Sequence, residues 1–415
     1  MSCSALARPV KTSWPTSPLA ELAEMFSDGD WIESKDQSTS GIRLLQTGNV
    51  GGGEFKDRAE KARFISAGTF ARLNCTEVLA GDILISRLPD PVGRACIVPE
   101  LDTRMITAVD CSIVRLDEQL ILPKLFVYFT QTDAYLSEVA ALCTGTTRSR
   151  ISRTALGQIE FPTPPMDEQK RIVAVLDQAF AALDRARANC EESLQAAEGL
   201  LRRALGDEFE AIASQSSSLA LQDAVHPDCS LSYGIVQPGD EVSNGLPIVR
   251  PVDLTRREVG LAGLKRIDLR AARGYARTTL KGGELLLCVR GSTGAISVAE
   301  DELAGSNVTR GIVPIRFEPT RVLRDFAYFQ FCFGAIRSQI AEKTYGAALM
   351  QINIKDLRNL RFVVPDIALQ RDVIARSEAL INSATALRTS YKAQIADIAA
   401  LRQSLLQAAF SGQLT

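Results

Sequence analysis

The chain has 415 residues, of which 46% are hydrophobic and 23% are charged, and its formal net charge is −2. This length predicts two to four domains with ample core, and the composition is that of a soluble globular protein. No apolar run approaches the ~20 residues that span a bilayer, and Met1 to Pro18 lack the apolar segment of a secretory signal. These observations exclude an integral membrane protein and predict a cytoplasmic one.

Residues 1–166 are predicted to form a first globular domain. Short runs such as Asp82 to Ser86 and Ser112 to Leu116 alternate with turn glycines and predict strands. Leu125 to Leu142 is predicted to be a helix with large apolar residues along one face. The domain is therefore expected to be of the α/β kind.

A long helix is predicted over residues 167–213. The prolines between Pro162 and Pro165 end any strand that reaches them, and Asp167 and Glu168 follow where acidic groups suit the start of a helix. The apolar residues then recur in steps of four and three, which is the pattern of a coiled-coil seam. The predicted seam consists of Ile172, Leu176, Ala179, Leu183, Ala186, Cys190, Ala197, Leu201 and Ala204, and Leu200 also fits the pattern in place of Leu201.

The remainder of the chain repeats this arrangement. A polar linker, residues 214–218, opens a second domain over residues 214–365, with a helix expected from Phe326 to Ile340, and a second long helix and tail occupy residues 366–415. Two ordinary core helices are the alternative, but both segments are about three times the usual helix length. We therefore favour one antiparallel coiled coil. Its second seam would be Val373, Ser377, Leu380, Ala384, Leu387, Tyr391, Ile398, Leu401, Leu405 and Ala408.

An internal repeat supports this organisation. Gly81 to Arg87 resembles the segment that begins at Gly283, and Gln169 and Gln370 occupy the same place near the start of the two long helices. Several such pairs follow in order at a nearly constant offset, which a chance match would not produce. The predicted fold class is α+β: two similar α/β domains, separated by two long helices, with pseudo-two-fold symmetry.

The charge is unevenly distributed between the halves. Residues 1–166 carry 17 basic and 20 acidic groups, whereas residues 219–365 carry 19 basic and 15 acidic groups. The first domain is thus negative by three charges and the second is positive by four. This pattern is compatible with DNA binding without being diagnostic of it.

The motifs of common catalytic sites are missing from the sequence. It contains no phosphate loop of the G-x-x-x-x-G-K-[ST] type and no Asn-Pro-Pro-Tyr motif for methyl transfer to an amino group. The nine cysteines form no C-x-x-C pair, and His226 is the only histidine, so neither a zinc site nor a catalytic triad is expected. A binding protein without methyltransferase, nuclease or ATPase activity of its own is the better prediction.

Five segments resemble the DNA specificity subunit of type I restriction–modification systems. They are Trp14 to Leu22, Gly81 to Arg87, Gly145 to Ser152, Pro164 to Val173 and Leu401 to Leu414, and they follow the order of that family across nearly the whole chain. The second helix departs from the pattern, because Asp366 to Gln370 replaces the usual acidic-Gln start.

The resemblance implies two target-recognition domains that read the two halves of a bipartite DNA sequence, with the coiled coil as a ruler between them. It also implies two methyltransferase subunits and motor-nuclease restriction subunits as partners. S-adenosylmethionine, ATP and Mg would then belong to those partners, and this chain would hold no cofactor. The alternatives are the recognition module of a fused or type II-like methyltransferase–nuclease, and a coiled-coil scaffold that does not bind DNA.

DNA recognition needs side chains that donate to phosphates and read base edges. Each candidate arginine has the alternative of being a solvated or ion-paired surface group. The candidate DNA-binding residues are Arg87, Arg94, Thr146, Thr147, Arg148 and Arg150 in the first domain, and Arg250, Arg290, Asn307, Arg310, Gln351 and Asn353 in the second. The candidate subunit-docking residues are Gln169, Arg171, Gln370, Arg371, Phe410 and Leu414.

Overall fold

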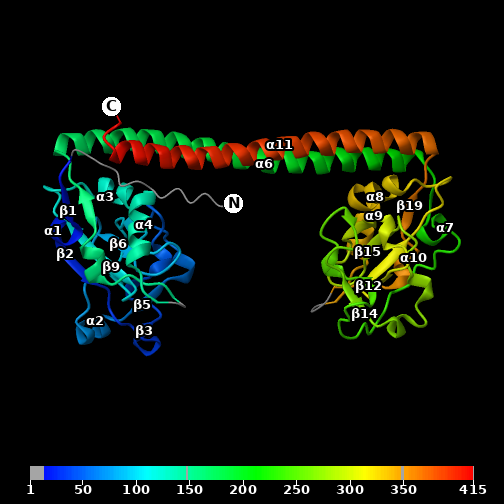
Figure 1. Ribbon diagram of the computed structural model, residues 1–415, viewed down its shortest axis with the longest axis horizontal. Helices are drawn as coiled ribbons and strands as arrows, with labels where there is room; N and C mark the ends of the chain where they lie inside the picture. Colours follow the sequence, from blue (N-terminus) through cyan, green and yellow to red (C-terminus); the bar gives the residue numbers. More distant parts are fainter. Residues whose placement is uncertain (1–13, 146–147, 347–349, 415) are drawn as a thin grey trace. The chain divides into compact units, whose positions relative to one another are not determined.

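The computed structural model describes residues 14–145, 148–346 and 350–414, and it divides into two compact units (Figure 1). Unit 1 contains Met1–Cys190 and Ala393–Thr415, and unit 2 contains Glu191–Lys392. Each unit therefore combines one globular part with a segment of both long helices.

The globular part of unit 1 is built on two four-stranded sheets. The first has the order β2-β9-β6-β7, is antiparallel throughout, and consists of Ala23–Asp28, Cys111–Leu116, Ile83–Ser86 and Ala95–Ile97. The second has the order β3-β5-β4-β8 and consists of Gln37–Ser38, Arg63–Ile65, Ile42–Leu45 and Met105–Thr107, with β4 and β8 parallel. The strands predicted at residues 82–86 and 112–116 are confirmed as β6 and β9.

The alternating side chains of strand β6 show how the layers of unit 1 are arranged. Ile83 and Ile85 point to one face and pack against helices α3 (Pro123–Phe129) and α4 (Asp133–Leu142), whereas Leu84 points to the other face and packs against residues of the second sheet. The smaller elements are α1 (Leu19–Leu22), α2 (Ala67–Leu73), α5 (Arg153–Gly157) and the antiparallel pair β1 (Thr16–Pro18) and β10 (Glu160–Pro162).

Unit 2 repeats this architecture. Its first sheet has the order β13-β16-β15-β18 and consists of Glu258–Val259, Ile296–Ala299, Leu285–Cys288 and Ile312–Ile315. Its second sheet has three strands in the order β14-β12-β17, which are Lys265–Ile267, Leu246–Val249 and Asn307–Val308. Helices α8 (Arg324–Phe333) and α9 (Ala335–Glu342) cover the face to which Leu285 and Leu287 point. The remaining elements are α7 (Leu221–Ala224), α10 (Ile354–Arg358) and the pair β11 (Ser218–Ala220) and β19 (Arg361–Val363). The internal repeat is therefore a repeat of fold.

The prediction of one helix from Leu125 to Leu142 is wrong, because the segment is broken between α3 and α4. Helix α3 ends at Phe129, and Thr132 caps the start of α4, its side chain accepting a hydrogen bond from the backbone of Tyr135. The matching helix expected from Phe326 to Ile340 is also broken, at Gly334, which ends α8 and precedes α9 without a side-chain cap. Two short helices at an angle cover more of a sheet face than one straight helix does.

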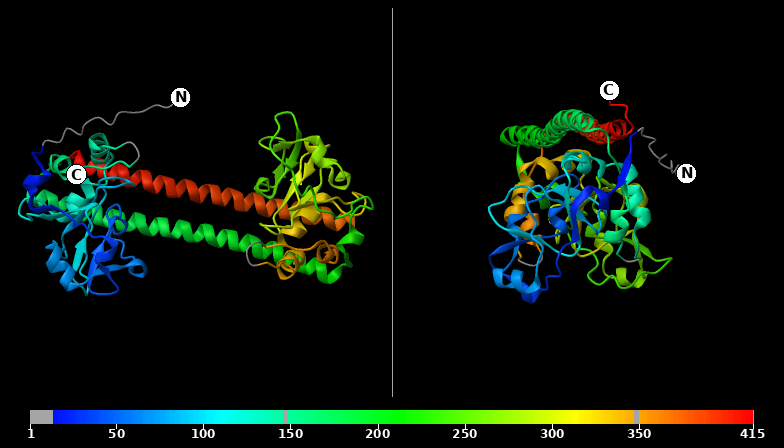
Figure 2. Two further views of the ribbon diagram at one scale, coloured as in Figure 1. Left: turned by 90° about the horizontal axis from the view of Figure 1, so that it is seen from below. Right: turned by 90° about the vertical axis from the view of Figure 1, so that its left-hand side faces the viewer.

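The long helices are α6 (Met166–Gln215) and α11 (Ile367–Phe410), and they lie side by side in each unit (Figure 2). In unit 1, Arg402 donates to Asp184 at 3.0 Å and the Cys190 thiol donates to Gln394 at 3.4 Å. Residue numbers thus rise along one helix as they fall along the other. The pairing is antiparallel, as predicted, and in unit 2 it includes an ion pair of 2.6 Å between Arg376 and Glu208.

The predicted seam of α11 is wrong at three positions. Leu380, Leu387 and Leu401 are 40%, 49% and 49% exposed, whereas Ile381 and Ile395 are partly buried. The helix carries two apolar stripes that lie one residue apart, and periodicity alone does not choose between them. The leucines therefore form an uncovered stripe. On α6, by contrast, the predicted seam residues are all buried or half-buried, while the neighbouring Leu200 is 67% exposed.

Candidate nucleic-acid interface

A closed loop in unit 1 presents the first candidate arginines. Thr144 and Arg150 exchange backbone hydrogen bonds of 2.9 Å, and Arg148 lies exposed within the loop they close. Thr146 and Thr147, also predicted to bind DNA, lie outside the described residues. The side chain of Arg150 is 41% exposed and lies 3.4 Å from a carboxylate oxygen of Asp110. Arg148 and Arg150 are thus available for an external anion.

Arg87 lies beneath this loop and serves the fold. Its side chain is only 6% exposed, and it forms an ion pair of 2.8 Å with Asp28. It also donates to the backbone oxygen of Val109 at 2.7 Å, and Arg150 reaches the same oxygen at 3.4 Å. Burial lowers the pKa of the Arg87 guanidinium, against the attraction of Asp28. Arg87 supports the loop from below, and its burial disfavours direct contact with DNA.

Arg94 is also committed to intramolecular contacts. Its guanidinium donates four hydrogen bonds of 2.8–2.9 Å to backbone oxygens. The acceptors are Thr47, Val50, Leu88 and Pro91, so the side chain joins two loops. Burial lowers the pKa of this guanidinium as well.

The matching loop of unit 2 is closed by Tyr345 and Gln351, whose backbones exchange hydrogen bonds of 2.9 and 2.8 Å. Gln351 also forms a bridge to Arg290, which follows strand β15. Arg310 is exposed, and the charges of Arg290 and Arg310 act to lower the pKa of Tyr233, although burial raises it overall. The structure thus brings two predicted arginines and Gln351 together around two tyrosines.

Tyr233 and Tyr345 are residues that sequence reasoning missed. They are 37% and 50% exposed, and a tyrosine ring with a free face suits contact with sugars or bases. The available signal was the position of Tyr345 directly before Gly346, where the first domain has Thr144 before Gly145.

The other candidates of unit 2 are occupied within the fold. Arg250 holds both carboxylate oxygens of Asp253, at 3.1 and 2.9 Å. Asn307 is 1% exposed and accepts a hydrogen bond of 2.8 Å from Thr278. Asn353 caps α10, its side chain accepting from the backbone of Asp356 at 2.8 Å. The hydrogen-bonding groups of these three side chains are therefore used within the domain.

The two glutamines predicted to dock partners are buried at the starts of the long helices. Gln169 is 1% exposed; it accepts from the backbone of Leu122 at 2.8 Å and donates to the oxygens of Leu120 and Pro164 at 2.8 and 2.9 Å. Gln370 is fully buried and makes the same three bonds to the equivalent backbone groups of unit 2, at 2.7, 2.9 and 2.8 Å. Each glutamine fastens its long helix to the loop that precedes the first covering helix.

The other docking candidates divide between core and surface. Phe410 is 3% exposed and packs edge-on against Phe129, with ring centroids 5.1 Å apart, and Leu414 packs partly buried against the same core. Arg171 is paired with Glu168, and Arg371 is exposed. Only the two arginines are available to a partner.

No group of three or more potential metal ligands occurs in the part of the chain that the structure describes. Over the same described ranges, no helix is long and apolar enough to cross a membrane. The features that remain are two similar domains with arginine-bearing loops and a pair of long helices.

Comparison with known proteins bears on this arrangement. The family described as type I restriction modification DNA specificity domain matches residues 11–190. The EcoBI specificity subunit of Escherichia coli is 24% identical over 310 residues, which cover 69% of this chain and 65% of that subunit, so the match spans less than two thirds of the relative. The EcoKI specificity subunit of Escherichia coli K12 is 24% identical over 74% of this chain and 68% of its own.

Two solved structures share the fold over almost their whole length. A chain from a study of the assembly and conformational transition of the type I R-M system has a TM-score of 0.75 at 19% identity, covering 97% of this chain and 98% of its own. The HsdS subunit from Thermoanaerobacter tengcongensis has a TM-score of 0.56 at 16% identity, covering 98% and 99%.

The structure contains two similar domains, each with a loop closed by backbone hydrogen bonds, together with a pair of long helices. Residues 11–190 match the family of type I restriction modification DNA specificity domains, and over about 70% of its length the chain is similar to type I specificity subunits.

Proposed function

We propose that this chain reads a bipartite DNA target, with one half-site recognised by each unit. The observation that carries the proposal is the repeated loop: Thr144 to Arg150 in unit 1 and Tyr345 to Gln351 in unit 2 are closed by the same backbone pairing. In both units the residue after the loop bonds to the end of a central strand, Ile151 to Arg87 and Ile352 to Val289.

The direct DNA contacts would come from donors that are exposed or half-buried. These are Arg148 and Arg150 in unit 1 and Arg290, Arg310 and Gln351 in unit 2. Arginine is suited to this role because its forked guanidinium pairs with phosphates and with guanine edges. The target-recognition domains would be residues 1–166 and 214–365, and the spacer helices residues 167–213 and 366–415.

The long helices would act as a ruler and as a docking surface. Helix α6 has 50 residues and is therefore about 75 Å long, which exceeds the roughly 34–36 Å between half-sites one DNA turn apart. The exposed leucine stripe of α11 (Leu380, Leu387 and Leu401) would receive the methyltransferase subunits, because an amphipathic helix docks through such a face.

The wider assembly follows from the family. Two methyltransferase subunits and the restriction subunits would bring S-adenosylmethionine, ATP and Mg, while this chain supplies sequence recognition without catalysis. The complex would act in the cytoplasm, where its DNA substrate is.

Methylation mapping tests the proposal. The chain is co-expressed with its methyltransferase, and the methylated sequence is read across a host genome. Replacing Arg148 and Arg150 by alanine should relax one half-site, at about 1–3 kcal/mol of discrimination for each arginine–base pairing removed, and replacing Arg290 and Arg310 should relax the other. Arg185→Ala, an exposed arginine on α6, is the control and should leave both unchanged. Relaxation of the same half-site by both pairs would refute the assignment of one half-site to each unit.

A further inference from the structure

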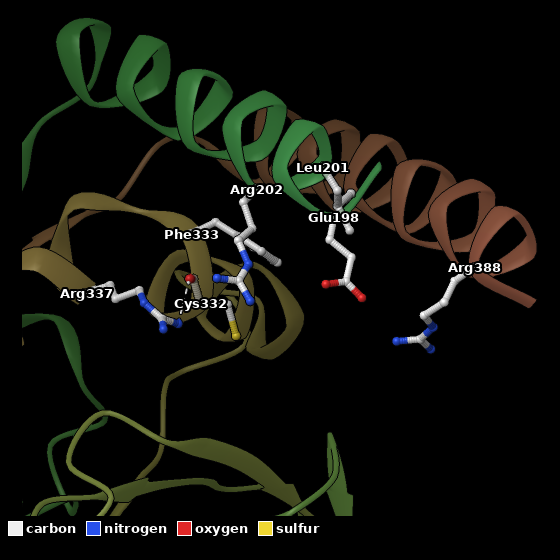
Figure 3. Close-up of a pocket in the computed structure, with 7 residues that line it drawn as sticks. All are labelled: Glu198, Leu201, Arg202, Cys332, Phe333, Arg337 and Arg388. Carbon is white, nitrogen blue, oxygen red and sulfur yellow. Dashed lines mark hydrogen bonds between the residues drawn. The ribbon is translucent and has the colours of Figure 1, made fainter. Parts of the chain in front are cut away.

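Unit 2 contains a groove lined by three arginines. It lies between the two long helices and the junction of α8 with α9, and its volume is about 500 Å³. Arg202 and Glu198 extend from α6, Arg388 from α11 and Arg337 from α9, while Phe333 and Leu201 supply apolar walls (Figure 3). A cavity of this size lies within the range of small-ligand sites, roughly 300–1,000 Å³.

The positive charge of this groove is only partly compensated. The lining contains three guanidinium groups and one carboxylate, that of Glu198, which leaves two positive charges in excess. Within the described residues, the side chains of Arg202 and Arg388 have no hydrogen bond or ion pair, and the side chain of Arg337 donates only to the backbone oxygen of Cys332, at 3.3 Å. Arginines without acceptors, brought together from three helices, are suited to an external anion.

The internal repeat provides a comparison within the same molecule. Gln403 and Leu136 of unit 1 stand 201 positions from Arg202 and Arg337, the same offset that separates Gln169 from Gln370. Gln403 donates to the backbone of Gln131 at 3.2 Å, so in unit 1 that position serves the fold. The fold therefore does not need the two arginines.

The position equivalent to Arg388 is Arg187, which already has an interaction partner. The position equivalent to Glu198 is Ala399. The equivalent positions of unit 1 thus hold one arginine in place of three, so the cluster of arginines is a property of unit 2, although the surrounding architecture is shared by both units.

We propose that the groove formed by Arg202, Arg337 and Arg388 binds a phosphate group. A phosphate offers several acceptor oxygens in the geometry of the guanidinium fork, so one phosphate can accept from more than one of these arginines. The phosphate comes either from the backbone of DNA held by unit 2, which rests on the proposed function, or from a free nucleotide. Backbone contact would fix the position of the duplex on unit 2 without reading its sequence.

The test uses the residues that unit 1 carries. The double variant Arg202→Gln with Arg337→Leu gives the groove the side chains of Gln403 and Leu136, which the same fold accommodates. Arg185→Gln with Arg203→Gln removes the same charge from exposed positions of α6 outside the groove and is the matched control. Both are compared with the wild type in the complex with the methyltransferase.

The first measurement is duplex affinity against salt concentration. If the groove holds a backbone phosphate, the slope of log K against log salt should fall by about 0.9 for each phosphate that the variant no longer neutralises, with the methylated sequence unchanged and the control unaffected. The second is calorimetric titration of the full chain with pyrophosphate and with ATP, without Mg. Binding by the wild type that is absent from the groove variant would assign the site to a free phosphate.

The proposal would be overturned if the groove variant and the wild type showed the same salt slope and the same calorimetric binding of pyrophosphate and ATP. Loss of methyltransferase association in the groove variant alone would also overturn it, because the groove would then bind an acidic protein segment. Failure of the proposed function would look different: the wild type itself would show no bipartite methylation.

Discussion

Replacing Gln169 by leucine should destabilise unit 1 because three buried backbone groups would lose their partner. The side chain is 1% exposed and bonds to Leu122, Leu120 and Pro164 at 2.8–2.9 Å. Leucine has a similar size but offers no hydrogen bond. Leaving a buried polar group unpaired costs about 1–3 kcal/mol, and leucine regains part of this through apolar burial, so we expect a loss of about 2–4 kcal/mol.

The tryptophans make this measurable in unit 1 alone. The chain has two, Trp14 and Trp31, and both belong to unit 1. Urea unfolding followed by tryptophan fluorescence should therefore show a lower midpoint for Gln169→Leu, by about 1 M at the m-values usual for a unit of this size. Gln370→Leu should leave the urea midpoint of the fluorescence transition unchanged, and it should lower the midpoint of the unit 2 transition that circular dichroism detects.

The matched control is Gln178→Leu, an exposed glutamine on the same helix, which should change stability by less than about 0.5 kcal/mol. If Gln169→Leu cost no more than this control, the hydrogen bonds at the helix start would not stabilise the unit. Equal shifts of the fluorescence transition by Gln169→Leu and Gln370→Leu would show that the units do not unfold separately.

Two further outcomes are expected. Arg94→Ala should cost about 3 kcal/mol because four backbone oxygens lose their donor, whereas Arg148→Ala should cost less than about 0.5 kcal/mol; equal unfolding midpoints would contradict this. Burial raises the pKa of Cys96 and of Cys111 to about 12, so folding retains their protons. The contribution of these two thiols to the free energy of unfolding should be fully present below about pH 8.5, the pKa of an unfolded thiol. It should be lost as the pH rises toward 12. Cys96→Ala should flatten that fall, and an equal slope in the variant would count against it.

The architecture was predictable because it rests on periodic and repeated signals. The steps of four and three along α6 and the paired segments of the two halves depend only on local sequence, and they led to two α/β domains with paired long helices. The break at Gly334 is hard to predict because apolar residues flank the glycine on both sides, whereas the polar run from Thr130 to Asp133 was an available signal for the break at Thr132. The exposed leucines of α11 were misplaced because the choice of stripe depends on the partner helix.

The candidate site was less predictable because burial depends on distant residues. Arg87 and Arg148 look equally available in the sequence, yet Arg87 is buried against Asp28, which lies 59 positions earlier in the chain. Gln169 and Gln370 were noticed as a repeated pair, but only their three backbone partners show that they serve the fold. The tyrosines of unit 2 gather with Arg290 and Arg310 through tertiary folding alone.

The central claim is that the long helices set the spacer of the target while the domains read its halves, and shortening the helices tests it most directly. The pairs Asp184 with Arg402 and Cys190 with Gln394 show that residues 186–192 lie opposite residues 392–398. Removing both segments deletes one heptad from each helix, keeps the seam in phase, and shortens the pair by about 10 Å, or at most about three base pairs. Genome-wide methylation by this variant should show a shorter spacer between the same two half-sites. An unchanged spacer with altered half-sites would contradict the account, because the helices would then be packing elements of the domains.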